Sequence, residues 1–135
     1  DEVPAAPGAI VRAHETVLLV EDEPAMLRVT STALVNLGYE VLAASMPAEA
    51  LRIAESHPGP IDVLLTDVVM PEMNGRDLAA RLRARRPGIA CVYMSGYTAD
   101  VIAHRGILGE GVLFIQKPFP IAALAAKLRE ALTSA

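Results

Sequence analysis

The sequence predicts a single α/β domain in which helices cover both faces of a parallel sheet. Short apolar runs such as 16–20 (TVLLV) are typical of strands that are buried on both faces. These runs alternate along the chain with amphipathic segments of helical period, and such alternation is the pattern of an α/β domain. The chain has 135 residues, 53% of them hydrophobic, which is enough for one domain with a substantial core.

The first half of the chain is expected to supply three strands and two helices. The strand at 16–20 is followed by Pro24, which suits the first turn of a helix, and Gly38 stands where the C-terminal cap of that helix is expected. Between them, apolar residues recur at helical spacing, namely Met26, Val29, Ala33 and Leu37. The further elements expected here are a strand at 40–44, a helix at 47–57 and a strand at 61–66 that runs into Asp67.

The second half continues the alternation. A helix at 74–86 is expected to turn Leu78 and Leu82 inward. Its arginines are expected mostly on a solvated face, and they are Arg76, Arg81, Arg83, Arg85 and Arg86. The last helix begins near Ile121, and its apolar stripe comprises Ile121, Leu124, Leu128 and Leu132. The remaining elements expected are a strand at 89–94, a weaker helix at 98–107 and a strand at 112–115.

Residues 1–15 are expected to form a linker or a disordered N-terminal segment, and residues 16–135 the domain. The first segment mixes Pro, Ala and Gly with scattered charges and shows little periodicity. The chain does not begin with methionine, so the sequence is compatible with a piece excised from a larger protein.

Composition argues against several classes of protein. The longest uncharged run, 87–99, is shorter than the roughly 20 residues needed to cross a bilayer, so no transmembrane helix or membrane contact of this domain is expected. The N-terminus lacks the basic and apolar regions of a secretory signal. The single cysteine, Cys91, allows no internal disulfide, which fits a cytoplasmic location, and it is expected to pack in a buried strand. The net charge of −4 offers no basic surface for nucleic acid.

Chemistry is expected where the strands end, because ligands of a doubly wound sheet bind outside the carboxyl ends of its strands. Acidic residues follow the first and third strands, a serine follows the fourth and a lysine the fifth; they are Glu21, Asp22, Asp67, Ser95 and Lys117. Crowded carboxylates repel one another unless a cation intervenes, and Mg²⁺ is the natural candidate. With Mg²⁺ and a lysine, such a site suits phosphoryl transfer to a carboxylate nucleophile. Taken singly, each residue is better explained as a turn, cap or loop residue, and the functional interpretation depends on four strand ends delivering these groups together.

Four segments carry a resemblance to a known family. LLVEDEP, LLTDVVMPEMNG, YMSGYT and IQKPF resemble, in order and spacing, motifs of the receiver domain of bacterial two-component response regulators. The resemblance covers about Thr16 to Thr133. It implies a flavodoxin-like doubly wound sheet of five parallel strands, in the order 2-1-3-4-5, with five helices.

The resemblance implies roles for the acidic residues. Asp67 is the implied phosphoacceptor. Asp22 would contact Mg²⁺ directly, together with Asp67 and the main-chain carbonyl of Val69. Glu21 would act mainly through a metal-bound water, and it replaces the aspartate that is common at this position in the family.

The resemblance also implies how the domain would respond to phosphorylation. Ser95 would bond a phosphoryl oxygen and Lys117 would pair with the phosphate, and the peptide between Lys117 and Pro118 is often cis in the family. Phe114 takes the position of the switch aromatic. A conformational change through Ser95 and Phe114 would alter a partner surface on the fourth and fifth helices.

The implied partner is a histidine kinase or a histidine phosphotransfer domain, which would donate a phosphoryl group from phosphohistidine. The segments MSGYT and AHRG resemble receivers fused to hybrid sensor histidine kinases, so we expect such a receiver or a single-domain response regulator. The domain would promote its own phosphorylation and dephosphorylation. If it is part of a hybrid, the full-length protein would be a kinase, and that kinase could tether the domain to a membrane. Dimerisation through the fourth and fifth helices stays open.

Two other functions compete with this one. A Mg²⁺-dependent phosphatase with an aspartyl nucleophile typically has a second aspartate two residues later, and Val69 occupies that position here. A receiver-like interaction module that is never phosphorylated would be favoured by loss of the key residues, and all of them are present.

Overall fold

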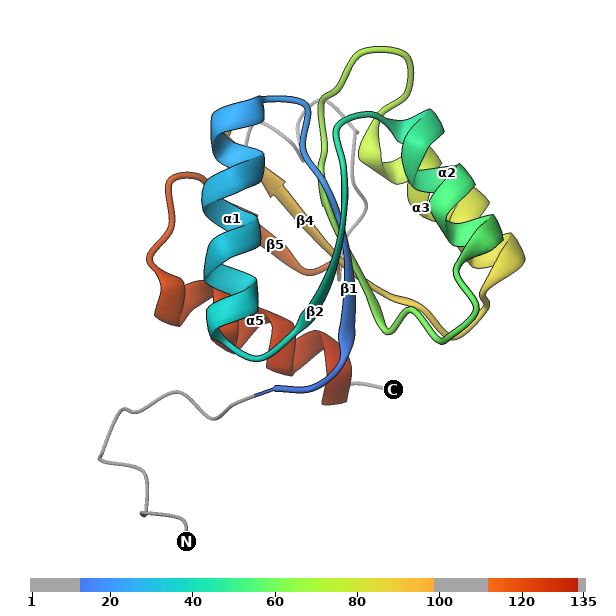
Figure 1. Ribbon diagram of the computed structural model, residues 1–135. Coiled ribbons are helices and arrows are strands. Elements are labelled where there is room, and N and C mark those ends of the chain that lie inside the picture. The colour runs from blue at the N-terminus through green and yellow to red at the C-terminus, as the bar shows by residue number, and fades with distance from the viewer. Residues whose placement is uncertain (1–12, 99–111, 134–135) are drawn as a thin grey trace, which may run out of the picture.

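The computed structural model describes residues 13–98 and 112–133, which form a single sheet with helices on both of its faces (Figure 1). All strand pairs are parallel and their order is β2-β1-β3-β4-β5, so the predicted flavodoxin-like topology is confirmed. The strands are β1 (Thr16–Val20), β2 (Glu40–Ala44), β3 (Val63–Asp67), β4 (Ala90–Ser95) and β5 (Phe114–Gln116). The fifth strand therefore begins and ends slightly later than the predicted 112–115.

Two helices lie on each face of the sheet among the described residues. Helices α1 and α5 cover one face, and α2 and α3 cover the other (Figure 1). They are α1 (Pro24–Asn36), α2 (Pro47–Ser56), α3 (Gly75–Arg85) and α5 (Ile121–Thr133). The weaker helix predicted at 98–107 falls almost wholly on residues 99–111, outside the part of the chain that the structure describes. In the described part, no helix is both long and apolar enough to cross a membrane.

The core consists of two apolar layers, one on each side of the sheet. Along β1, Leu18 and Val20 pack into the layer beneath α2 and α3, whereas Val17 and Leu19 pack into the layer beneath α1 and α5. All four side chains are fully buried. Because neighbouring side chains of a strand point to opposite faces, a strand that is buried on both faces is expected to be mainly apolar. Cys91 packs in the first layer, as predicted.

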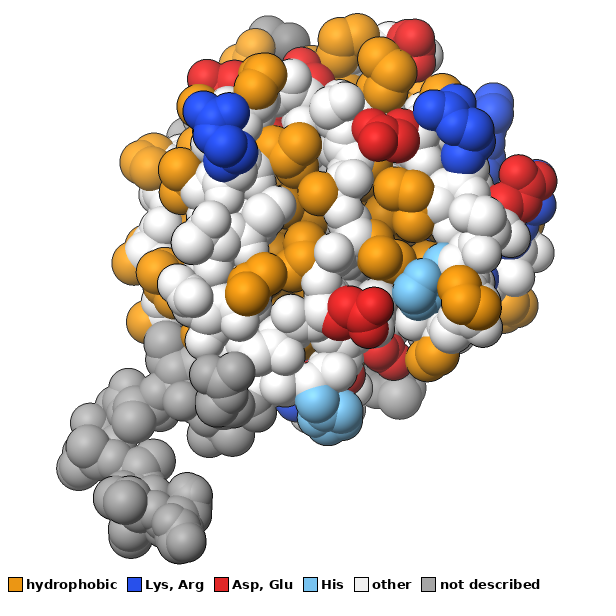
Figure 2. Space-filling view, in the orientation of Figure 1, with side chains coloured by type: hydrophobic (Ala, Val, Ile, Leu, Met, Phe, Trp, Pro, Cys, Tyr) orange, Lys and Arg blue, Asp and Glu red, His pale blue; other side chains and the backbone are white. Residues whose placement is uncertain are grey.

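The buried face of α1 differs in part from the apolar spacing that predicts the helix. Thr30, Ala33 and Leu34 are buried, whereas Val29 is 64% exposed. At the edge of the sheet formed by β2, hydrophobic side chains lie between α1 and α2 (Figure 2). The basic side chains on the side of the molecule shown there form no continuous patch.

Residues at the end of the predicted linker bond to the domain. The main-chain N–H of Ala13 donates to the carbonyl of Leu37 (2.8 Å), and the carboxylate of Glu15 forms an ion pair with Arg129. Gly38, which has a φ of +105°, lies against this segment, and a Cβ atom at this position would come within 2.4 Å of the Ala13 carbonyl oxygen. A glycine is therefore required here both for its backbone conformation and for the close approach.

Arg86 is an exception to the predicted solvated face. Its guanidinium donates two hydrogen bonds to the carbonyl of Ala54 (2.9 and 3.2 Å) and one each to those of His57 and Gly59 (both 2.9 Å). These carbonyls lie at and just beyond the C-terminal end of α2, where main-chain acceptors lack partners within the helix. Arg86 therefore caps α2 and ties it to the end of α3.

Replacement of Arg86 with alanine is expected to lower the free energy of unfolding by about 2 kcal/mol, because partly buried carbonyls lose a charged donor. Arg86→Lys should lower the free energy of unfolding by nearly as much, because an ammonium lacks the planar guanidinium fork that reaches several acceptors at once. Urea unfolding of the purified domain measures both variants. Arg85→Ala is the control: its guanidinium is 51% exposed and pairs with Glu55 (3.1 Å), so its loss should change stability by less than about 0.5 kcal/mol. Equal effects of the two alanine variants would contradict the capping role.

Candidate active site

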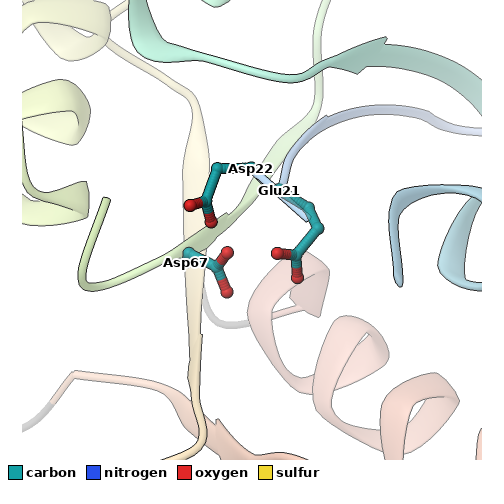
Figure 3. Close-up of side chains that lie close together, drawn as sticks. All are labelled: Glu21, Asp22 and Asp67. Carbon is teal, nitrogen blue, oxygen red and sulfur yellow. The ribbon is translucent and has the colours of Figure 1, made fainter. Parts of the chain in front are cut away.

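Three carboxylates converge at the carboxyl end of the sheet. Glu21 and Asp22 directly follow β1, Asp67 ends β3, and their side chains point toward one another (Figure 3). One oxygen from each lies within 4.8 Å of the others. Glu21 and Asp67 are buried, with exposed fractions of 1% and 3%, whereas Asp22 is exposed. The carboxylates that the sequence places at two strand ends therefore form one cluster.

The ammonium of Lys117 lies inside this cluster. Its Nζ atom is 2.7 Å from Oδ1 of Asp67 and 2.9 Å from Oε1 of Glu21. Lys117 directly follows β5, and its main-chain N–H donates to the carbonyl of Ser95 (2.7 Å), which fixes the start of its side chain. The peptide between Lys117 and Pro118 is cis.

Burial and crowding act strongly on the ionisation of the two buried acids. Burial, followed by the hydrogen bond with Glu21, raises the pKa of Asp67 to about 8, although Lys117 acts in the opposite direction. Burial alone would also raise the pKa of Glu21, but hydrogen bonds with Asp67, Lys117 and the main chain of Glu23 outweigh it and lower that pKa. Burial would lower the pKa of Lys117, and its contacts to Asp67 and Glu21 raise it instead. Without a further cation, burial and the neighbouring Glu21 therefore disfavour ionisation of Asp67.

The donor atoms of the cluster fit a hard divalent cation. When ionised, the three carboxylates and the ammonium carry a formal charge of −2. Oδ1 of Asp67 is buried and accepts no hydrogen bond from any described residue, so its contact with Lys117 leaves acceptor capacity unused. Carboxylate oxygens are the ligands that Mg²⁺ prefers, and these groups could hold such an ion.

Ser95 and Phe114 occupy different places in the sheet. Ser95 ends β4 at the same edge of the sheet and is 4% exposed, and its hydroxyl oxygen accepts a hydrogen bond from the main chain of Tyr97 (3.0 Å). Phe114 begins β5, pairs with Tyr93 of β4 and packs against the core layer beneath α2 and α3. Val69 lies two residues beyond Asp67, and its side chain is 51% exposed.

The structure adds backbone supports that the sequence analysis did not assign. The main-chain N–H of Glu23 donates to Oε2 of Glu21 (3.1 Å), and the hydroxyl of Thr66 donates to the carbonyl of Asp67 (2.9 Å). The start of α3 lies so close to β3 that a Cβ atom on Gly75 would come within 2.2 Å of the same carbonyl oxygen. Gly75 ends the segment LLTDVVMPEMNG, but its contact with Asp67 depends on the packing of a helix against a strand.

Known proteins resemble this chain in sequence and in fold. The model of the family described as the response regulator receiver domain matches residues 17–129. Sensor kinase CckA of Brucella abortus (strain 2308) is 41% identical over 117 residues, which are 87% of this chain and 12% of that kinase. The DNA-binding transcriptional regulator NtrC of Azospirillum brasilense is 31% identical over 119 residues, 88% of this chain and 24% of that regulator. The crystal structure of the receiver domain from hybrid histidine kinase CckA superposes with a TM-score of 0.73 at 36% identity, covering 87% of this chain and 99% of that one.

These matches differ in how much of the other protein they include. The chain spans less than a quarter of the length of both full-length relatives, but nearly all of the solved receiver domain. The family match also extends from β1 into α5 and includes both strand ends that carry the acidic cluster. The chain therefore belongs to the family of response regulator receiver domains.

Proposed function

We propose that this domain accepts a phosphoryl group from a phosphohistidine onto Asp67, in a Mg²⁺-dependent reaction, and changes conformation as a result. The observation that carries the proposal is the buried carboxylate of Asp67, which lies 2.7 Å from the ammonium of Lys117 and beside two further carboxylates. A nucleophile, a fixed cation and a set of oxygen ligands are thereby present in one place. They are the groups that transfer to a carboxylate requires.

In the transfer, a carboxylate oxygen of Asp67 attacks the phosphorus atom and the phosphorus–nitrogen bond of the donor breaks. The histidine leaves with the bonding electron pair, and the product is an aspartyl phosphate. Asp22, Asp67 and the main-chain carbonyl of Val69, with Glu21 nearby, would hold Mg²⁺, which neutralises negative charge on the phosphoryl oxygens. Lys117 pairs with one of these oxygens. In hydrolysis, water attacks the same phosphorus, phosphate is released and the carboxylate of Asp67 is restored.

The response to phosphorylation begins at Ser95. Its hydroxyl, which now accepts from Tyr97, would turn to donate to a phosphoryl oxygen, and Phe114 would move inward as the end of β4 shifts. The proposed donor is a histidine kinase or a histidine phosphotransfer domain in the cytoplasm. We place the domain in a hybrid sensor histidine kinase or in a single-domain regulator, and the 41% identity to the sensor kinase CckA supports the first of these contexts.

Incubation of the domain with acetyl phosphate tests the proposal. The intact mass should rise by one phosphoryl group only when Mg²⁺ is present, and peptide mapping should place that group on Asp67. Mg²⁺ alone should also raise the unfolding temperature, because an ion that binds only the folded state stabilises it. A chelator should abolish both effects. If a folded sample with Mg²⁺ gains no mass, the phosphoacceptor function is refuted and an interaction module becomes the better description.

A further inference from the structure

Thr66 is the polar residue that lies inside β3, directly before Asp67. Its exposed fraction is 0%, and its partners in the sheet are Val20 of β1 and Tyr93 of β4. A buried hydroxyl destabilises a fold unless it is hydrogen-bonded. The hydroxyl of Thr66 donates to the main-chain carbonyl of Asp67 at 2.9 Å, within the usual range for such a bond. It therefore acts on the main chain of the proposed phosphoacceptor.

The side chain of Thr66 has little room to turn. Its Cγ2 atom lies 3.1 Å from the position that a Cβ atom on Gly75 would take, and its hydroxyl oxygen lies 3.9 Å from Sδ of Met70. A β-branched side chain is also restricted in its rotamers by its own shape. Contacts with the start of α3 and with the loop after β3 thus keep the hydroxyl at the Asp67 carbonyl.

The bonded carbonyl belongs to the peptide that joins Asp67 to Val68, and the next peptide is bonded as well. The main-chain N–H of Val68 donates to the carbonyl of Met94 (3.0 Å), and the carbonyl of Val68 accepts from the N–H of Gly75 (2.8 Å). Because a peptide group is planar, fixing the Asp67 carbonyl fixes the rotation about the Cα–C bond of Asp67. The carboxylate of Asp67 and the main chain that leads to Val69 then keep one relative orientation.

We propose that Thr66 is a positioning residue for phosphorylation: its hydroxyl holds the main chain of Asp67 so that the acceptor carboxylate and the carbonyl of Val69 keep a fixed relative position. This inference rests on the proposed phosphoacceptor function of Asp67. Thr66 acts through the main chain of its neighbour and needs no contact of its own with the phosphoryl group or the ion.

Two matched pairs of proteins isolate the hydroxyl. Thr66→Val, compared with wild type, replaces the hydroxyl with a methyl group. A methyl carbon stays about 3.3–3.6 Å from an oxygen atom, so the Asp67 carbonyl must move by about 0.5 Å. Thr66→Ser and Thr66→Ala both lose the methyl group of threonine, and they differ from each other only in the hydroxyl. The second pair serves if circular dichroism shows that Thr66→Val does not fold.

The rate of phosphorylation by saturating acetyl phosphate with Mg²⁺ is the first measurement. Thr66→Val should react about tenfold more slowly than wild type, and Thr66→Ala about tenfold more slowly than Thr66→Ser, because a small displacement of a reacting group is costly. Thr66→Ser should react at the wild-type rate, although loss of a buried methyl group lowers its midpoint of urea unfolding. A role in packing alone would instead make Thr66→Ser slow.

Thr16→Val is the matched control. Thr16 is also a buried strand threonine, and its hydroxyl donates to Oε1 of Glu40 (3.3 Å) at the start of β1, the end of the strand far from the carboxylates. Its loss should leave the rate unchanged. Equal rates within both pairs, or a loss in Thr16→Val as large as that in Thr66→Val, would overturn the inference.

Mg²⁺ affinity, measured by calorimetric titration without a phosphoryl donor, separates this inference from the proposed function. Mg²⁺ demands nearly ideal octahedral geometry, so its dissociation constant should rise about fivefold in Thr66→Val and stay at the wild-type value in Thr66→Ser. A Thr66→Val variant that binds Mg²⁺ as tightly as wild type would overturn the inference. Failure of the wild type to become phosphorylated would instead refute the proposed function, and the affinities would still report whether Thr66 positions the ligands.

Discussion

Asp67→Asn is expected to abolish phosphorylation by acetyl phosphate and, at the same time, to make the metal-free domain more stable. An amide is not a nucleophile toward phosphorus under these conditions, so no phosphoryl group should be gained. The carboxyl of Asp67 is 3% exposed and lies beside Glu21, and its ionisation at neutral pH is therefore unfavourable. Asparagine has the same shape but does not ionise. The free energy of unfolding of the variant should therefore be about 1–2 kcal/mol higher than that of wild type at pH 7.

The pH dependence of stability provides a second measure of the same residue. The pKa of Asp67 is about 8 in the folded domain against 3.8 for an unperturbed aspartate, so the folded state holds a proton that the unfolded state releases. The contribution of Asp67 to stability must therefore fall as the pH rises between these two values. Urea unfolding of wild type and Asp67→Asn at about pH 5 and about pH 8, with a chelator present, should show the advantage of the variant growing with pH. A variant that is less stable than wild type at both pH values would contradict this account.

The sheet is predictable from the sequence because burial on both faces leaves a clear signal. In TVLLV, side chains from Val17 to Val20 pack alternately into the two core layers, so the whole run is apolar. The order of the strands does not follow from such runs, because hydrophobicity does not specify which strands are neighbours. That order came from the family resemblance.

The faces of the helices are less predictable than their existence. Apolar spacing predicts α1, but Val29 in that spacing is 64% exposed, whereas the neighbouring Thr30 is 2% exposed. The period of a helix fixes which residues share a face, and the direction of that face depends on the angle at which the helix packs. Arg86 shows the same limit, since its acceptors at and just beyond the end of α2 lie 27 to 32 residues away in sequence.

The position of the acidic residues and Lys117 directly after their strands predicts that they share one edge of the sheet. It does not predict which of them are in contact. The bond between Lys117 and Glu21 joins residues 96 positions apart, and it depends on the length of one side chain. The close packing of Gly75 against Asp67 likewise depends on how near α3 lies to β3. Such distances are set by tertiary packing, and no local pattern in the sequence records them.

Gly75→Ala is expected to damage both the fold and the site. The new Cβ atom would come within 2.2 Å of the carbonyl oxygen of Asp67 and 3.1 Å of Cγ2 of Thr66, and a main-chain oxygen cannot rotate out of the way. Either α3 must move away from β3 or the Asp67 peptide must turn. We expect a loss of about 3 kcal/mol in the free energy of unfolding. Displacement of the acceptor carboxylate by about 1 Å should slow phosphorylation by about a hundredfold.

Two glycine variants separate loss of stability from loss of positioning. Gly88→Ala meets no atom within 4 Å and should leave both stability and the phosphorylation rate unchanged. Gly38→Ala combines a φ of +105° with a contact of 2.4 Å to the Ala13 carbonyl oxygen, so it should be destabilised as strongly as Gly75→Ala. Its strain lies at the end of α1, away from the carboxylates, and its folded fraction should therefore react with acetyl phosphate at the wild-type rate. If Gly38→Ala and Gly75→Ala slow the reaction equally, the effect of Gly75 is general instability, and its proposed role in placing Asp67 is wrong.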